Sequence, residues 1–469
     1  MPKLKTWQFT AGSAVAGLAL AAGAVTVAGP WDSGQRKAER ELAAAQDRTG
    51  GAHHETRRPD PAEPAPAPSA RSVLAGLGAP GAPDAARLGR TLGPLLDDPA
   101  LGPLRTASVV DVATGKQLYG RGADTAMTPA STVKIATAVA ALSALGPDHR
   151  IATTVLAAPD AKGIVLKGGG DPTLEKEQLR SLAADTARAL RDRGAGPVSL
   201  SYDTTLYTGP AVHPIGAGNE NLATVTSLMV NEGRTDGTRS GTGDRTPDPA
   251  GDAARTFAAE LRSLGVKLTG DPASAKAPAG ATPVAKTLSA PLSALVERTL
   301  TNSDNDIAEA LARQTALAAG EQASFEGAGR ATYDRLAKLG LPGKGLLTGA
   351  HFADGSGLDR NDRVSASLLT ALLARAADPA HPELRSVLTG LPVAGFSGTL
   401  QTRYSAGSSG TGLVRAKTGT LSHINTLSGT AVGPDGRLLA FAFLAGDTVA
   451  PGPAQKSLDK LASALATGA

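Results

Sequence analysis

Residues 129–145 read PASTVKIATAVAALSAL, and the rest of the chain is interpreted outward from this stretch. Apolar residues recur in it at helical spacing among many alanines, and a proline stands at its start, as is usual for a buried helix. Ser131 and Lys134 are three residues apart, which places both side chains on one face of such a helix. A serine hydroxyl is a weak nucleophile that needs a base within reach. The stretch therefore predicts a buried helix that begins with a serine and a candidate base.

This spacing alone does not identify a catalytic serine. Ser457 and Lys460 repeat it near the C-terminus. For that second copy we expect an ordinary exposed helix face.

Two further short motifs follow the first one along the chain. Ser303-Asp304-Asn305 lies between two predicted helices, where these residue types by themselves favour helix capping. Lys417-Thr418-Gly419-Thr420 lies on a predicted strand, and alone it is typical of a polar strand end. Its glycine also suits a substrate lying against a strand edge, with the lysine and hydroxyls facing an anion such as a carboxylate.

The order and spacing of the three motifs are more informative than any one of them. Together they form the signature of serine β-lactamases and penicillin-binding proteins. Ser131 and Ser303 are 172 residues apart, and Ser303 and Lys417 are 114 apart. The first gap is far longer than a compact β-lactamase shows, so we expect an inserted domain between the first two motifs.

The hydropathy pattern predicts an α+β fold with an antiparallel sheet flanked by helices. Strand-like runs occur near both ends of the folded part, with helical segments between them, so strands from both ends close one sheet. The predicted strands are 107–112, 118–119, 413–417, 426–432 and 438–444. Shifts in composition assign 72–157 and 284–469 to this main domain and 158–283 to a smaller inserted domain.

The N-terminal region has the composition of an export signal and a tether. Lys3 and Lys5 precede an uncharged run over 11–29 that ends in small residues, which indicates a signal peptide or an uncleaved membrane anchor over 1–30. Residues 31–71 are charged and then rich in proline and alanine, which is typical of a disordered tether. Both forms of the signal place the rest of the chain outside the cytoplasm.

Composition excludes several classes of function. The chain has no cysteine, which removes thiolate zinc sites and cysteine nucleophiles. A net charge of +4 over 469 residues is too small and too dispersed to indicate a nucleic-acid partner. The histidines show no paired metal-ligand spacing, so we expect neither a metal nor a cofactor.

From about Leu88 to its C-terminus, the chain resembles the class C low-molecular-mass penicillin-binding proteins. These are the D-alanyl-D-alanine carboxypeptidase/endopeptidase family of serine peptidases. Besides the three motifs, residues 169–174 (GGDPTL), 354–358 (DGSGL) and 398–400 (GTL) look like family segments. The resemblance implies a penicillin-binding-protein/β-lactamase-like domain with an insert. The insert is shorter than is usual in the family, so we expect one reduced inserted domain in place of two.

The resemblance also implies a role for each motif residue. Ser131 attacks the carbonyl between two terminal D-alanines, and Lys134 acts as its base, with the charge of Lys417 lowering the pKa of that lysine. Ser303 relays the proton to the leaving amine, and Asn305 binds the substrate backbone. The substrate partners implied are peptidoglycan stem peptides ending in D-Ala-D-Ala, and β-lactams are implied as covalent inhibitors.

Other residues match positions that bind substrate in the family. Lys417, Thr418 and Thr420 hold the substrate carboxylate beside Gly419, and the backbone N–H groups of Ser131 and Thr420 form the oxyanion hole. A pocket for a side-chain amine is implied at four further positions, which are Asp203, Leu358, Arg360 and Leu421. For Asp203, a turn residue at a strand end is an equal interpretation.

Two other functions share these motifs. A secreted serine β-lactamase uses the same acylation chemistry but hydrolyses its acyl-enzyme quickly, and we identify no water-activating base in the sequence. A catalytically inactive, cell-wall-binding relative keeps the fold alone. The five intact motif residues argue against that alternative, because a binding module has no physical need of all of them.

Overall fold

A computed structural model of the 469-residue chain describes residues 85–404 and 407–468, all within one compact unit. The predicted signal or anchor at 1–30 and the predicted tether at 31–71 lie outside the described residues, as does the start of the main domain before residue 85. Within the described residues, no helix is both long and apolar enough to cross a membrane.

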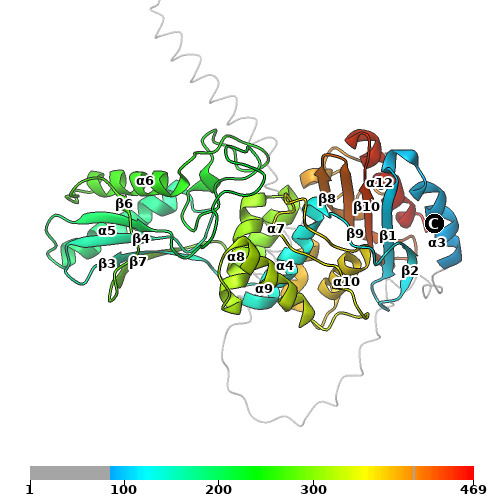
Figure 1. The fold of residues 1–469 in the computed structure, drawn as a ribbon, viewed down its shortest axis with the longest axis horizontal. Helices are drawn as coiled ribbons and strands as arrows, with labels where there is room; N and C mark the ends of the chain where they lie inside the picture. Colours follow the sequence, from blue (N-terminus) through cyan, green and yellow to red (C-terminus); the bar gives the residue numbers. More distant parts are fainter. Residues whose placement is uncertain (1–84, 405–406, 469) are drawn as a thin grey trace, which may run out of the picture. The chain divides into compact units, whose positions relative to one another are not determined.

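The first sheet is antiparallel and joins strands from both ends of the described chain (Figure 1). Its order is β2-β1-β10-β9-β8, so β1 near the N-terminal end pairs with β10 near the C-terminal end. This confirms the predicted α+β class and the closure of the sheet by strands from both ends. The strands are β1 (Leu104–Asp111), β2 (Gln117–Arg121), β8 (Val414–Leu421), β9 (Ile424–Val432) and β10 (Leu438–Gly446).

Helices bury both faces of this sheet. Along β10 alternate side chains enter different apolar clusters, since neighbouring residues of a strand point to opposite faces. Ala440, Ala442 and Leu444 pack with α4 and α10, whereas Phe441 and Phe443 pack with α3 and α12. The helices of this first lobe are α3 (Ala85–Leu96), α4 (Lys134–Leu145), α7 (Leu292–Asn302), α8 (Asn305–Ala319), α9 (Phe325–Ala337), α10 (Ala366–Ala377), α11 (Arg385–Thr389) and α12 (Pro451–Ala466).

A second sheet forms a second lobe between the first two motifs (Figure 1). Its order is β6-β5-β4-β3-β7, and α5 and α6 share an apolar core with it. The elements are β3 (Ala152–Ala157), β4 (Gly163–Lys167), α5 (Lys176–Asp192), β5 (Ser199–Asp203), α6 (Pro249–Ser263), β6 (Ala273–Ser274) and β7 (Thr282–Leu288).

The second lobe differs from its sequence-based description in two respects. The predicted boundaries, 158–283, leave out β3 and most of β7, because β3 pairs with β4 and β7 and not with the first sheet. The lobe also contains α5, a helix that the composition-based boundaries did not indicate and that buries a leucine and alanine face. The lobe therefore extends over 152–288.

An irregular segment over 204–248 connects β5 to α6, with one 3-10 turn at Asn231–Gly233. It leaves the second lobe and contacts the first. The backbone N–H of Ala223 donates to Asp306 of α8, and the His213 ring bonds to Asp354 of the loop before α10. This segment therefore reaches the region of the motifs.

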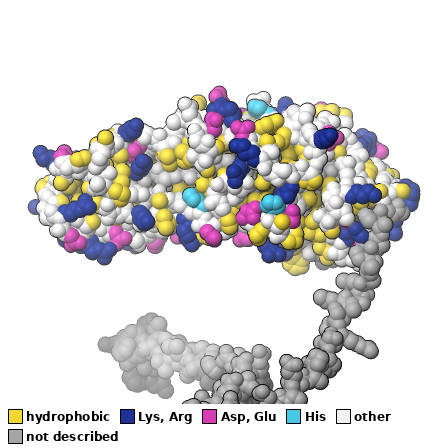
Figure 2. Space-filling view, turned by 90° about the horizontal axis from the view of Figure 1, so that it is seen from below, with side chains coloured by type: hydrophobic (Ala, Val, Ile, Leu, Met, Phe, Trp, Pro, Cys, Tyr) yellow, Lys and Arg dark blue, Asp and Glu magenta, His cyan; other side chains and the backbone are white. Residues whose placement is uncertain are grey.

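The surface agrees with the low net charge of the chain. Figure 2 shows Lys and Arg side chains interspersed with Asp and Glu over one face, without a continuous basic area.

The stability of the first sheet depends on its aromatic face. Phe441 and Phe443 are fully buried, with ring centroids 5.1 Å apart. We expect Phe441→Ala to lower the free energy of unfolding by about 3–5 kcal/mol, because a cavity replaces the ring. Urea denaturation measures it. Phe396, which is 65% exposed, is the matched control, and Phe396→Ala should change stability by less than about 0.5 kcal/mol. Equal losses would contradict this account of the core.

Candidate active site

Ser131 and Lys134 lie at the junction of a 3-10 turn and a buried helix. The turn covers Ala130–Val133, and α4 begins at Lys134, three residues later than the start of the predicted helix. Because a 3-10 helix has three residues per turn, residues i and i+3 are aligned. Lys134 Nζ is 2.9 Å from Ser131 Oγ, and Ser131 is half-buried while Lys134 is fully buried. The predicted pairing of these two side chains is present.

The amine of Lys134 has three hydrogen-bond acceptors from separate parts of the chain. Its Nζ lies 2.9 Å from Ser131 Oγ, 2.7 Å from Asn305 Oδ1 and 2.5 Å from the carbonyl oxygen of Ser356. An ammonium has three N–H groups and fills all three acceptors, whereas a neutral amine has two. When the neutral amine donates to Asn305 and Ser356, its lone pair points to the hydroxyl of Ser131. The site can therefore hold Lys134 as a base.

Burial shifts the pKa of Lys134 towards the neutral range. Desolvation lowers it to about 8, and the carboxylates of Asp354 and Asp304 oppose the shift. The sequence attributed this shift to the charge of Lys417, but burial is the main cause. Burial also lowers the pKa of Lys417 well below its usual value, and there the charge of Lys134 is the second cause.

The second motif connects α7 to α8. Ser303 caps α7 in a left-handed conformation, with φ 59° and ψ 38°. Asp304 is the N-cap of α8 and accepts from the N–H of Ile307, so the capping interpretation of this motif is also correct. The turn places Ser303 Oγ 2.9 Å from Lys417 Nζ and brings Asn305 to Lys134. The second motif thus contributes one residue to each lysine, Ser303 to Lys417 and Asn305 to Lys134.

The third motif lies on β8, at the edge of the first sheet. Thr418 Oγ1 is 2.9 Å from Thr399 Oγ1, which belongs to the 398–400 segment noted in the sequence. Thr420 is exposed, and Gln455 of α12 lies 3.4 Å from its hydroxyl. A strand at a sheet edge has free backbone groups for a substrate to pair with.

Gly419 and Gly357 allow the backbone to approach the turn of Ser131 closely. A Cβ on Gly419 would lie 2.8 Å from the carbonyl oxygen of Pro129 and 2.1 Å from Thr426 Oγ1. A Cβ on Gly357, which has φ +83°, would lie 2.2 Å from the carbonyl oxygen of Ala130. The turn that carries Ser131 is therefore enclosed by two backbone segments that tolerate no side chain.

Three of the four predicted amine-pocket residues are neighbours. Leu358 and Arg360 follow the turn at Asp354, and Arg360 Nη2 donates to the carbonyl of Ser422, 3.1 Å away. Ser422 follows Leu421 in the β8–β9 turn, so this contact brings the loop of Leu358 to the end of β8. Leu358 and Leu421 are half-buried.

Asp203 does not share this environment. Its side chain is used within the second lobe, where one oxygen accepts from the N–H and hydroxyl of Thr205 and the other from the N–H of Ala277. The residue is 3% exposed. This geometry favours the alternative interpretation, a turn residue at a strand end, and the amine-binding role of Asp203 stays a prediction.

The sequence reasoning missed the turn that supplies the third acceptor of Lys134. The carboxylate of Asp354 accepts from Ser356 Oγ and from the N–H groups of Gly357, Leu358 and Asp359, at 2.6–2.9 Å. Glu309 of α8 accepts from the N–H of Ser356, 2.9 Å away. Residues 354–358 resemble a family segment, but no sequence pattern indicates that the Ser356 carbonyl faces Lys134.

Two groups of buried acidic residues have the spacing of a metal site, but their side chains form hydrogen bonds and ion pairs within the protein. His213, Glu309 and Asp354 form one group, and a second consists of Glu232, Asp304 and Asp306. In the first, the carboxylates bind backbone N–H groups and the His213 ring. In the second, the carboxylates form ion pairs with Arg234, Arg245 and Arg298. We therefore assign hydrogen-bonding and ion-pairing roles to both groups.

The second serine–lysine pair has a structural role. Ser457 is buried, not exposed as the sequence predicted, and its hydroxyl donates to Asp98 at 2.6 Å. Asp459 between the pair is bound by Arg403. This copy of the spacing stabilises the packing of α12.

Comparison with known proteins decides the family. Residues 88–241 and 235–465 match the family described as D-Ala-D-Ala carboxypeptidase 3 (S13). The chain belongs to this family. Among its relatives, Carboxypeptidase DacB of Mycolicibacterium smegmatis is 35% identical over 88% of this chain and 91% of its own length. A D-alanyl-D-alanine carboxypeptidase of Actinomadura sp. is 31% identical over 76% of this chain and 81% of its own.

A solved structure supports the fold of this S13 protein. Penicillin binding protein 4 of Haemophilus influenzae aligns with a TM-score of 0.66 at 21% identity, over 82% of this chain and 99% of its own. The predicted penicillin-binding-protein-like fold and the enzyme class, a serine-type D-Ala-D-Ala carboxypeptidase, are confirmed. Membership of this family implies an extracytoplasmic location in the cell envelope.

The close approach at Gly419 is open to a direct test. We expect Gly419→Ala to lower the free energy of unfolding by about 1–3 kcal/mol, because β8 or the Ser131 turn has to move away. Thermal melts measure the change. Gly452, in the first turn of α12, has open space around its Cβ position, so Gly452→Ala should be neutral or slightly stabilising. A stable Gly419→Ala protein would contradict the packing described here.

Proposed function

We propose that Ser131 is the nucleophile of this carboxypeptidase and that Lys134 is its base. The observation that carries the proposal is the set of three acceptors around Lys134 Nζ, which leaves the lone pair of the neutral amine for Ser131. The hydroxyl proton passes to Lys134 as Ser131 Oγ bonds to the carbonyl carbon between the last two D-alanines. The C–N bond then breaks, and an ester on Ser131 remains.

The other motif residues serve the leaving group and the substrate. Ser303, 2.9 Å from Lys417, relays a proton to the departing D-alanine amine. Asn305 binds the substrate backbone, and Lys417, Thr418 and Thr420 bind the terminal carboxylate beside Gly419. That anion favours the charged form of Lys417, which burial otherwise disfavours.

The edge position of β8 supports an oxyanion site at its end. The backbone N–H groups of Ser131 and Thr420 bind the developing oxyanion. Water then hydrolyses the ester and releases the shortened stem peptide. The same acyl-enzyme forms when the leaving amine belongs to a cross-linked neighbour, so endopeptidase activity belongs to the same proposal.

The proposal extends to β-lactams and to export. A β-lactam carbonyl reacts with Ser131 in the same way, but the opened ring stays attached, so the ester persists. In support, a solved structure of the Haemophilus protein is a complex with a novel β-lactam.

The proposal also covers export of the chain. Residues 1–30 export it as a signal peptide or anchor, and residues 31–71 tether the catalytic part.

An adduct experiment tests the nucleophile. We expect purified protein mixed with benzylpenicillin to gain the mass of the drug, with the adduct on the peptide that contains Ser131, and to release D-alanine from a D-Ala-D-Ala pentapeptide. Ser131→Ala should lose both activities while keeping its melting temperature. Rapid loss of penicillin without a lasting adduct would indicate a β-lactamase. Intact drug and unmodified protein would indicate an inactive, wall-binding relative.

A pH profile tests the base. Lys134 has a pKa of about 8 in the free protein, and only its neutral form accepts the serine proton. Raising the pH increases that form, so the acylation rate constant should rise about tenfold per unit below pH 8 and level off above it. Stopped-flow measurements with benzylpenicillin give the profile, and melting temperatures over the same range are the control. A flat profile would contradict the role of Lys134.

A further inference from the structure

Two of the groups that accept hydrogen bonds from Lys134 are the Asn305 amide and the Ser356 carbonyl. The 204–248 segment of the second lobe contacts Asn305 itself and the turn that carries Ser356. On the side of the second motif, Asn305 Nδ2 donates to the carbonyl of Asn221, 2.8 Å away. The next residue, Asp306, accepts from the N–H of Ala223 at 2.9 Å and pairs with Arg245 at 3.1 Å. Because Asn305 uses its Oδ1 for Lys134 and its Nδ2 for Asn221, the segment determines the orientation of this amide.

The same segment contacts the turn that carries the Ser356 carbonyl. His213 Nε2 lies 2.8 Å from Asp354 Oδ2, the oxygen that also binds Ser356 Oγ. The N–H of Ile215 donates to His213 Nδ1 at 3.0 Å. Because Nδ1 is an acceptor there, the ring proton lies on Nε2 and is donated to Asp354. His213 is thus one of the donors that fix the conformation of this turn.

Both contacts are fully desolvated. The side chains of His213 and Asp354 are 2% and 0% exposed, and those of Arg245 and Asp306 are 4% and 2% exposed. Removing one partner of a buried polar pair leaves the other without compensation. The contacts therefore define the position of the segment far more strictly than exposed ion pairs do.

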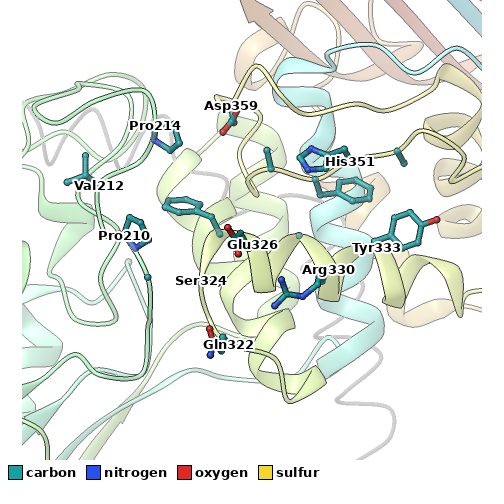
Figure 3. Close-up of a pocket in the computed structure, with 16 residues that line it drawn as sticks. Pro210, Val212, Pro214, Gln322, Ser324, Glu326, Arg330, Tyr333, His351 and Asp359 are labelled. Atoms are coloured by element: carbon teal, nitrogen blue, oxygen red, sulfur yellow. The ribbon is translucent and has the colours of Figure 1, made fainter.

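His213 is buried beside a cavity that its two sequence neighbours line. Its neighbours Val212 and Pro214 border a cavity of about 810 Å³, with Arg330 and Tyr333 of α9 on the other side (Figure 3). His213 itself packs edge-on against Phe325, with centroids 5.2 Å apart. The buried bond to Asp354 therefore acts together with the Phe325 contact and with the hydrogen bond from the N–H of Thr208 to the carbonyl of Ala323, 3.1 Å away, in holding this part of the segment against the first lobe.

We propose that His213 and Arg245 are positioning residues for acylation, which act by holding the Ser356 carbonyl and the Asn305 amide against Lys134. This inference rests on the proposed function of Lys134 as the base. It gives the second lobe a role in the chemical step itself, in addition to any contact with the substrate. A displacement of about 1 Å in catalytic groups is enough to lower a rate about 100-fold.

The test compares variants of the full chain in their reaction with benzylpenicillin. The drug is small and lacks a stem peptide, so its acylation rate reports the chemical step. We expect His213→Leu and Arg245→Gln each to lower the acylation rate constant by about 10- to 100-fold. His213→Gln keeps an N–H donor for Asp354 and should recover the rate to within a few fold of wild type. Arg255→Ala, an exposed control in α6 of the same lobe, should stay within about twofold.

Two further readouts separate positioning from general destabilisation. With a D-Ala-D-Ala peptide, kcat should fall more than KM in His213→Leu, because the acylation machinery and not substrate binding is disturbed. The pH midpoint of acylation should also move upward, since a loosened turn admits water to Lys134 and reduces the effect of burial on its pKa. Thermal melts at each pH establish the folded fraction.

The outcomes are distinct. Unchanged penicillin acylation in folded His213→Leu and Arg245→Gln, with slower turnover of stem peptides alone, would overturn the proposal and leave the second lobe a role in substrate selection. If His213→Leu does not fold, the acylation rates of Arg245→Gln and His213→Gln decide whether the proposal stands. Absence of acylation in the wild-type protein would instead overturn the proposed function from which this inference starts.

Discussion

The burial of one amine determines much of this structure. Lys134 has no exposed surface, and a buried amine costs free energy unless its N–H groups are hydrogen-bonded. The three acceptors come from the 3-10 turn before α4, the start of α8 and the turn before α10. These segments have to converge on one point, which requires the helical layer between them to be rigid. The same convergence lowers the pKa of Lys134 and directs its lone pair to a serine.

Close backbone contact provides the rigidity. The turn that carries Ser131 has an unfavourable positive φ at Ala130 and is enclosed by Gly357 and Gly419. Strained conformations of this kind persist only where the surroundings leave no alternative. Here the surroundings are a sheet buried on both faces, with β8 as its edge. The sheet therefore supports the turn of Ser131 and also provides an edge strand, β8, beside it.

The buried carboxylates close to the lysines need hydrogen-bond donors or positive charges to compensate their burial. Asp354 and Glu309 lie on one side of the site and Asp304 and Asp306 on another, and burial raises the pKa of Glu309 to about 7 and of Asp306 to about 6. Many of the groups that compensate these acids, His213 and Arg245 among them, come from the second lobe. The two lobes are thus joined by charge and hydrogen bonds next to the catalytic group, and not merely by the two chain crossings.

Features set by short stretches of chain were predictable from sequence, and those set by contacts between distant segments were not. The spacing of Ser131 and Lys134, the capping of α8 and the strands of the first sheet follow from local backbone geometry and hydrophobic patterning, so the α+β fold and the three motifs could be predicted. The hydrogen bonds from Lys134 to Asn305 and from His213 to Asp354 depend on how loops close over more than a hundred residues. No local periodicity encodes such closure, because its free energy comes from burying polar groups that meet only in the folded protein.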